Sequence, residues 1–174
     1  MKRSDFWWQA GGFAAVTLLG TILHFLFDWT GECTIVAPFS AVNESTWEHM
    51  KLLFWPLFFL TLVQVPFRAH PNYWGIKLSG ALTGLLLIPI LFYTYNGAIA
   101  KSPDWLNIAI FYISAAAALS LEYWAFRKCP SKDPHPIIAI AAFILLALFF
   151  VLFTFYPPHL PIFQDPITKT YGLQ

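Results

Sequence analysis

An all-α fold, a bundle of five transmembrane helices, is predicted by three features of this sequence. The chain has 174 residues, of which 58% are hydrophobic and 19% aromatic, and only 11% carry a charge. A soluble domain usually carries about twice that share of charged residues. The apolar residues also fall into five runs, each close to the roughly 20 residues that a helix needs to cross a bilayer. We therefore expect a multi-pass membrane protein.

The five runs predict five spans within a single transmembrane domain, residues 1–174. The second run is the weakest, because it contains Pro56, Gln64 and Pro66 and reaches full length only if its helix begins before Leu52. The predicted spans are residues 10–27, 47–67, 76–95, 106–126 and 136–156. Residues 157–174 are rich in proline and apolar side chains, and we expect them to form a tail that folds back on the bundle.

The positions of Lys and Arg predict the orientation of the bundle, because these residues gather on the cytoplasmic side. With the N-terminus inside, seven of them fall on the inner side and three on the outer side. The inner residues are Lys2, Arg3, Arg68, Lys77, Arg127, Lys128 and Lys132, and the outer residues are Lys51, Lys101 and Lys169. We therefore expect the C-terminus outside, with an ordered outer loop and an outer tail.

Charge and cysteine content exclude several classes of protein. The formal net charge of +1 offers no basic surface, so a nucleic-acid partner is excluded. Cys33 and Cys129 show no paired spacing and fall on opposite sides of the predicted membrane, which excludes a disulfide framework and a thiolate zinc site. Membrane lipid is the expected partner, and self-association is left open.

Histidines with nearby carboxylates are predicted to reach the outer end of the bundle from distant segments. His24 and Asp28 are four residues apart and share one helical face, so Asp28 could orient the imidazole. The tail could deliver His159 and Asp165 to the same end. The alternatives are a local pair that closes a helix end, and a pinned terminus whose histidine meets only solvent.

The segment before the second span adds a second polar group. If its helix starts near Asn43, Glu44 and Glu48 lie on one face and Ser45 and His49 on the neighbouring face. Two carboxylates, a hydroxyl and an imidazole suit metal ligation or acid–base chemistry. Ser45 and Glu48 also match a capping box, in which they only satisfy the amides of a helix start.

These residues predict a site with zinc as its candidate cofactor. His24, His49 and His159 are the expected metal ligands, supported by Asp28 and Asp165. The expected catalytic groups are Glu44, Glu48 and Ser45. Zinc with three histidine ligands and an open position could activate water.

The stretches HFLFDW, VNESTWEHMKLLFWP and YPPHLPIFQDPITKTYG resemble a family of small bacterial polytopic membrane proteins classed as a domain of unknown function. This resemblance covers essentially the whole chain and implies a multi-pass protein of the bacterial cytoplasmic membrane, with no activity attached. Ser45 and His49 are also similar to the serine and first histidine of ceramidase-like and adiponectin-receptor-like zinc hydrolases. Those proteins have seven spans and a late HxxxH motif, which this chain lacks.

Three functions remain open from the sequence. The first is a zinc-dependent membrane hydrolase acting on a lipid or other amphipathic substrate. The second is a small transporter of protons, metal ions or solutes, although no acidic residue lies at the centre of a predicted span. The third is a non-enzymatic binding or scaffold protein. Glu122, near the inner end of the fourth span, is expected to pair with Arg68 or Arg127.

Overall fold

The described part of the chain is helical. The computed structural model describes residues 3–99, 103–128 and 135–173, and this part contains five long helices and no strand. They are α1 (Arg3–Trp29), α2 (Thr46–Gln64), α3 (Tyr73–Ile99), α4 (Asp104–Lys128) and α5 (Pro136–Phe155). Two short 3-10 helices, η1 (Val65–Phe67) and η2 (Pro161–Phe163), follow α2 and α5. The predicted all-α fold with five helices is confirmed.

Each long helix is long and apolar enough to cross a membrane. The candidate spans are Phe6–Trp29, Thr46–Phe67, Tyr73–Ala98, Trp105–Lys128 and Pro136–Phe155. The second span reaches 22 residues because its helix begins at Thr46, ahead of its apolar run, as the sequence predicts. Pro56 and Pro89 lie inside α2 and α3. Membrane helices tolerate such prolines when neighbouring groups satisfy the freed carbonyls.

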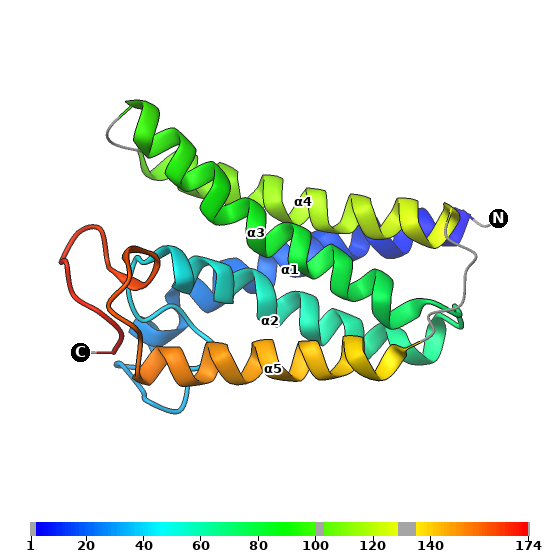
Figure 1. The fold of residues 1–174 in the computed structure, drawn as a ribbon, viewed down its shortest axis with the longest axis horizontal. Helices are drawn as coiled ribbons and strands as arrows, with labels where there is room; N and C mark the ends of the chain where they lie inside the picture. The colour runs from blue at the N-terminus through cyan, green and yellow to red at the C-terminus, as the bar shows by residue number, and fades with distance from the viewer. Residues whose placement is uncertain (1–2, 100–102, 129–134, 174) are drawn as a thin grey trace.

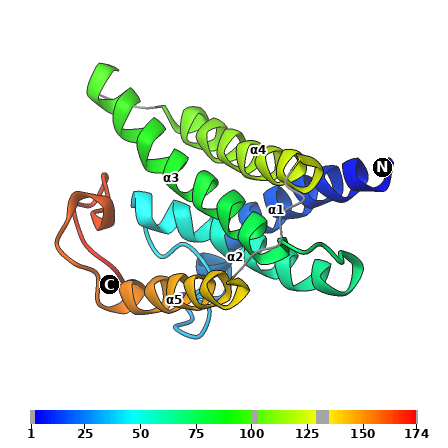
Figure 2. The same cartoon turned by 45° about the vertical axis from the view of Figure 1, so that its right-hand side comes forward.

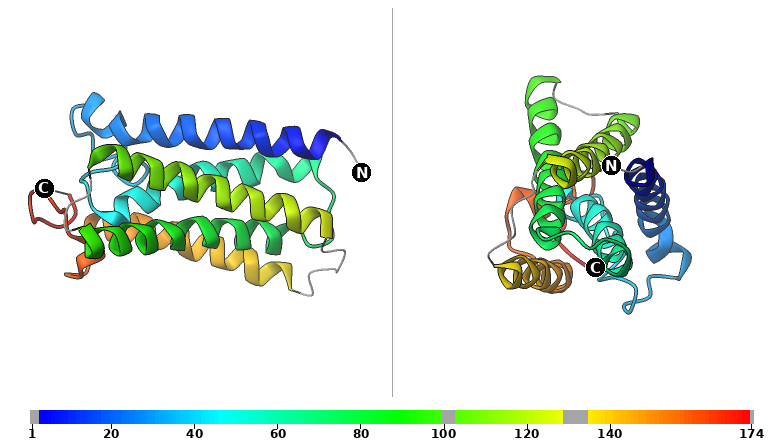
Figure 3. Two further views of the ribbon diagram at one scale, coloured as in Figure 1. Left: turned by 90° about the horizontal axis from the view of Figure 1, so that it is seen from above. Right: turned by 90° about the vertical axis from the view of Figure 1, so that its right-hand side faces the viewer.

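α2 is the central helix of the bundle. More than half of its span, 56%, is buried, against 22–39% for the other four spans. It packs against α1, α3, α4 and α5, whereas α1 and α5 lie on opposite sides of it (Figure 3). α3 and α4 pack closely because Gly80 and Gly84 of α3 face Ala118 of α4. Small residues at such a contact let two membrane helices approach closely.

We call the end of the bundle where α1 ends, α2 begins and α5 leads into the tail the tail end. At this end the α3–α4 hairpin tilts away from α2 and the C-terminal segment (Figures 1 and 2). The loop after α1 is fixed by Ser40, whose hydroxyl accepts the Phe27 N–H at 2.9 Å and donates to the Leu23 carbonyl. The other end, where α2 leads into η1, is the opposite end.

The C-terminal segment is attached to the loop before α2. The Asn43 side-chain amide donates to the Gly172 carbonyl at 3.0 Å, and η2 places Phe163 on the ring of Trp47. An isolated bridge between Gln164 and Tyr171 closes the segment on itself. Residues 157–173 therefore contact the start of α2, and residue 174 lies outside the described chain.

Two lysines used for the orientation lie inside the bundle. Lys51 and Lys77 are both fully buried, so neither is a loop charge. Lys2, Lys101 and Lys132 lie outside the described residues. The direction in which the chain crosses a membrane stays a prediction.

Candidate functional site

A groove of about 590 Å³ lies at the tail end between α1, α2 and α4. Its polar residues are His24 of α1, Glu44 of the loop before α2, His49 of α2 and Asn107 of α4. The other lining residues are mostly apolar: Gly20, Thr21, Phe25, Leu52, Ile108, Phe111, Tyr112 and Ile167. A polar end joined to apolar walls is typical of a ligand-binding site.

The floor of the groove depends on Gly20. A Cβ atom at this position would lie 2.4 Å from the ring of Phe111 and 3.1 Å from the Leu52 carbonyl oxygen. α1 can approach α2 and α4 this closely only because residue 20 has no side chain. The glycine therefore lets the edge of the Phe111 ring lie against α1 within the groove lining.

Three side chains from separate elements converge at the polar end of the groove. Nε2 of His24 lies 3.8 Å from one carboxylate oxygen of Glu44, and Nε2 of His49 lies 3.6 Å from the other. The two imidazole ring centres are 5.7 Å apart. His24, Glu44 and His49 are 28%, 43% and 20% exposed, so solvent or a ligand can reach all three.

The proton positions on His49 follow from its neighbours. Its Nδ1 lies 2.9 Å from the backbone carbonyl oxygen of Ser45. A carbonyl oxygen can only accept, so Nδ1 carries the proton of the neutral ring and Nε2 presents a lone pair toward Glu44. A free imidazole nitrogen beside a carboxylate can exchange protons with a bound group.

The start of α2 and the tail fix the position of Glu44. Ser45 is the N-cap of α2, and its hydroxyl accepts the Glu48 N–H at 3.3 Å. Because α2 begins at Thr46, Glu44 precedes the helix and does not share a helical face with Glu48, which differs from the arrangement predicted for a start near Asn43. The Glu44 N–H donates to the Asp165 carboxylate at 3.2 Å, so the tail fixes the backbone that presents Glu44.

Glu48 is engaged in a buried ion pair. Its carboxylate lies 2.5 Å from Nζ of Lys51 and accepts the Val42 N–H at 3.1 Å. Lys51 also donates to the Ala37 carbonyl at 2.8 Å and to the Thr154 hydroxyl at 2.9 Å. The ammonium group thus has three acceptors, one for each of its three N–H groups. This network ties α2 to α5 and to the loop after α1.

Ser45 and Glu48 therefore stand apart from the groove that Glu44 and His49 line. Neither belongs to its lining, and both are occupied by the capping and ion-pair contacts given above. Capping accounts for the Ser45 hydroxyl, as one alternative of the sequence analysis expected, but not for the Glu48 carboxylate: the Ser45 N–H donates to Asn43 Oδ1 at 2.9 Å, and Glu48 binds Lys51 and the Val42 N–H instead. Of the three expected catalytic groups, Glu44 alone faces the groove.

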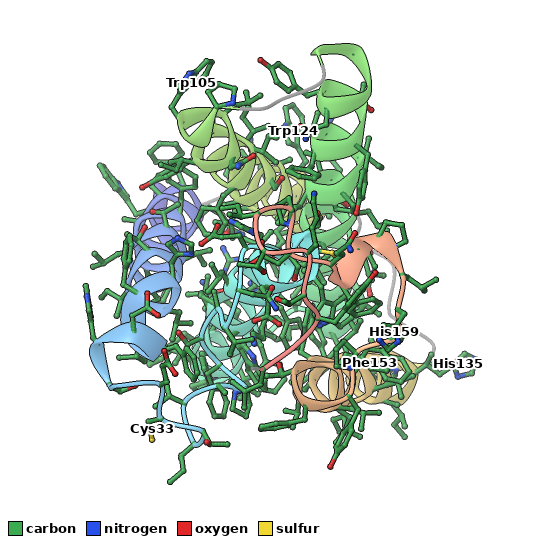
Figure 4. The ribbon with its side chains drawn as sticks, turned by 90° about the vertical axis from the view of Figure 1, so that its left-hand side faces the viewer. Cys33, Trp105, Trp124, His135, Phe153 and His159 are labelled. Atoms are coloured by element: carbon green, nitrogen blue, oxygen red, sulfur yellow. The ribbon has the colours of Figure 1, made fainter. Side chains whose placement is uncertain are left out.

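The other predicted site residues take different positions. His159 packs on the ring of Tyr171, 4.7 Å between ring centres, and lies beside α5 on the far side of the tail end from α1 (Figure 4). Asp28 is exposed, and it makes no ion pair with His24 among the described residues. The carboxylate within 4 Å of the His24 imidazole is that of Glu44.

The predicted zinc site with three histidines is not assembled in this arrangement. Across residues 3–99, 103–128 and 135–173, no group of three or more His, Cys, Asp or Glu side chains is placed to hold a metal ion. The physical reason is that the tail binds through Asp165 and Asn43, which leaves His159 with Tyr171. The structure brings together two of the three histidines, and Glu44 occupies the place expected for the third.

Asp165 holds the tail in place as a charged group. Its carboxylate accepts the N–H groups of Ile167 at 2.6 Å, Thr168 at 3.1 Å and Glu44 at 3.2 Å. Burial alone would raise the pKa of Asp165, but these amide hydrogen bonds stabilise the carboxylate more strongly. The pKa of Asp165 therefore lies below its ordinary value.

A second buried ion pair lies toward the opposite end. Glu122 of α4 and Lys77 of α3 are 2.6 Å apart, and the Gln9 side chain of α1 donates to Glu122 at 3.4 Å. The sequence analysis expected Arg68 or Arg127 as the partner of Glu122 and missed Lys77. A signal was present, because a lysine within an apolar run of a membrane helix needs a buried anion.

Comparison with known proteins gives a family and no activity. No curated protein and no solved structure matches the chain. The model of one family, described as "Family of unknown function (DUF6512)", matches residues 1–173 and thus covers both the groove and the tail that closes its end. The resemblance to a family of unknown function noted in the sequence is thereby confirmed. The chain belongs to this family, DUF6512.

Proposed function

We propose that this protein is a membrane-embedded hydrolase that acts on a lipid or other amphipathic substrate held in the groove. The observation that carries the proposal is the joining of an acid–base cluster, His24, Glu44 and His49, to apolar walls in one groove. The polar end would hold the bond to be cleaved, and the walls would hold the hydrocarbon chain.

The side opening of the groove supports a membrane substrate. Phe25, Ile108 and Tyr112 line the groove and are 42%, 59% and 40% exposed. All three lie within candidate spans, so this side of the groove would face lipid. A chain could then enter from the bilayer without crossing water, and its polar end would remain at the surface.

The chemistry assigned to the site is general acid–base hydrolysis of an acyl bond. His49 Nε2 takes a proton from water as the hydroxide oxygen bonds to the acyl carbon. The carbon–heteroatom bond then breaks, and His24 gives a proton to the leaving oxygen or nitrogen. Glu44, between the two rings, returns the proton from His49 to His24. General acid–base groups of this kind contribute about 10²–10⁴-fold to a rate.

Purified protein in phosphatidylcholine nanodiscs tests this function. We expect it to release the fluorophore from a dodecanoyl ester or dodecanoyl amide, and His49→Gln and Glu44→Gln to lower turnover about 100-fold or more. Glu32→Gln is the matched control, because Glu32 is exposed at the same end and does not line the groove. Turnover no higher than in empty nanodiscs, or equal in all variants, would rule out the hydrolase.

Zinc is tested in the same preparation. The sequence names zinc as the candidate cofactor, with His24 and His49 among its ligands. One zinc ion bound per protein molecule, and lost in both His24→Ala and His49→Ala, would show that the site holds a metal. Glu44 would then be a ligand in the place expected for His159. Full turnover after removal of metal by a chelator would assign the chemistry to the side chains alone.

A further inference from the structure

The polar end of the groove presents several hydrogen-bond acceptors. The Glu44 carboxylate can only accept, and His49 Nε2 is an acceptor because its Nδ1 donates to Ser45. Oδ1 of Asn107, also in the groove lining, is buried without a hydrogen-bond partner. A buried acceptor without a donor is costly, so a bound group that donates a hydrogen bond to Asn107 Oδ1 would remove that cost.

The groove has no fixed positive charge from a lysine or arginine. No Lys or Arg is among its described lining residues. Lys51, the basic residue of α2, is buried and bonded to Glu48, Ala37 and Thr154, and Lys169 of the tail donates to the Pro166 carbonyl at 2.7 Å. A phosphate or carboxylate head group would therefore meet Glu44 without a compensating cation.

The spacing of the acceptors suits one small cation. The two imidazole nitrogens lie 3.6 and 3.8 Å from the oxygens of Glu44, too far for a direct hydrogen bond. An ammonium nitrogen carries three N–H groups and bonds at about 2.7–2.9 Å, so it can bridge the Glu44 carboxylate and His49 Nε2. The rings of Phe25, Phe111 and Tyr112 in the same groove add faces that attract a cation.

We infer that the groove selects an amphiphile whose polar end is a primary amine, with its ammonium group bound by Glu44 and His49 and its chain along the apolar walls. The inference rests on the proposed function for its site and adds the class of ligand. A neutral alcohol would offer one donor and no charge. An anionic amphiphile would be rejected by Glu44.

Four ligands of equal chain length test the inference: dodecylamine, dodecyltrimethylammonium, dodecanol and dodecanoate. Their binding to the protein in phosphatidylcholine nanodiscs is measured by titration, with empty nanodiscs as the blank for partition into lipid. We expect dodecylamine to bind about tenfold or more tightly than dodecanol, because a hydrogen bond to a charged group exceeds a neutral one. The trimethylammonium ligand has charge without N–H donors and should fall between the two.

Matched variants locate the binding. Glu44→Gln should weaken dodecylamine about tenfold or more and leave dodecanol unchanged, whereas Glu32→Gln, the same charge change outside the groove, should alter neither. Equal affinity for amine and alcohol, tighter binding of dodecanoate, or an unchanged amine affinity in Glu44→Gln would overturn the inference.

The two proposals fail separately. If the protein shows no preference for amines but cleaves the ester or amide in a way that depends on Glu44 and His49, the ligand class is wrong and the hydrolase proposal is retained. If Glu44→Gln abolishes a preference for amines but the protein cleaves neither ester nor amide, the hydrolase proposal is wrong and the ligand class is retained.

Discussion

Two carboxylates at the start of α2 have opposite surroundings. Glu48 is buried against Lys51, and the ammonium group has three acceptors. Glu44, four residues earlier, is 43% exposed and faces two imidazole nitrogens beyond hydrogen-bond distance. The first is a completed network that ties the loop after α1, α2 and α5 together. The second is an incomplete one, and incomplete networks beside a groove are where ligands bind.

Removal of Glu48 should have the largest effect on stability. Glu48→Ala leaves the Lys51 ammonium buried without its anion, and we expect the free energy of unfolding to fall by about 3–5 kcal/mol. Thermal unfolding in one detergent measures the change. Glu44→Ala, at an exposed position before the helix, should shift it by no more than about 0.5 kcal/mol. Equal losses in both variants would erase the contrast between the two carboxylates.

The buried ion pair of Glu122 and Lys77 at the opposite end offers a second test of stability, because Gly80 packs against Glu122. A Cβ at Gly80 would lie 2.6 Å from Cγ of Glu122 and 3.0 Å from the Ala118 carbonyl oxygen, so Gly80→Ala should cost about 1–3 kcal/mol. Gly11→Ala is the matched control, because nothing lies within 4 Å of its added Cβ. In a helix interior that change should be neutral or stabilising by up to about 1 kcal/mol. The same unfolding assay decides, and a harmless Gly80→Ala would show that α3 and α4 are not in close contact there.

Loss of the N-cap should have a moderate effect on stability. Ser45→Ala removes the oxygen that accepts the Glu48 N–H, and we expect a cost of about 1 kcal/mol. The carbonyl that orients His49 belongs to the backbone of residue 45 and is retained, so dodecylamine binding should be unchanged. Binding lost in this variant at full stability would place the Ser45 hydroxyl in the site.

The smallest expected effect is that of pH on the attachment of the tail through Asp165. Because the pKa of Asp165 is lowered in the folded protein, its carboxylate stabilises the docked tail above the ordinary pKa near 3.8 and loses this effect as pH falls through its lowered value. Protection of the backbone amides of residue 165 and residues 167–171 against hydrogen exchange, corrected for intrinsic rates, should be constant from pH 7 to pH 5 and fall only below pH 4. Asp165→Asn should show weak protection throughout. A loss between pH 7 and pH 6 would assign the tail to a different titrating group.

The sequence predicts the five helices because the length of an apolar run is a local property. The capping alternative also gives the start of α2, because the Ser45 hydroxyl caps the Glu48 N–H through a contact that depends only on neighbours in the chain. The partner of Glu122 and the position of His159 depend instead on how helices and tail pack. Lys77 lies 45 residues from Glu122, and Tyr171 holds the His159 ring, which no spacing rule indicates.

In the groove, too, some residues could be predicted from local sequence and others depend on how the helices pack. His24 and His49 could be named from their residue type and their places at two helix ends. Glu44 could be named too, but its separation from Glu48 follows from a helix that begins two residues after Glu44. Asn107 and the apolar walls gave no signal, because a lone amide and an aromatic residue in a membrane helix are ordinary. Their role depends on tertiary packing, which places these residues of α4 beside His24 and His49.

For the proposed hydrocarbon ligand, the missing side chain at residue 20 would set how much room the groove leaves beside Phe111. A methyl group there would displace the Phe111 ring, which lines the groove, so Gly20→Ala should lower the affinity for long-chain ligands more than for short-chain ligands. Selectivity for head group and selectivity for length would then be set by different parts of the fold, and each could change without the other.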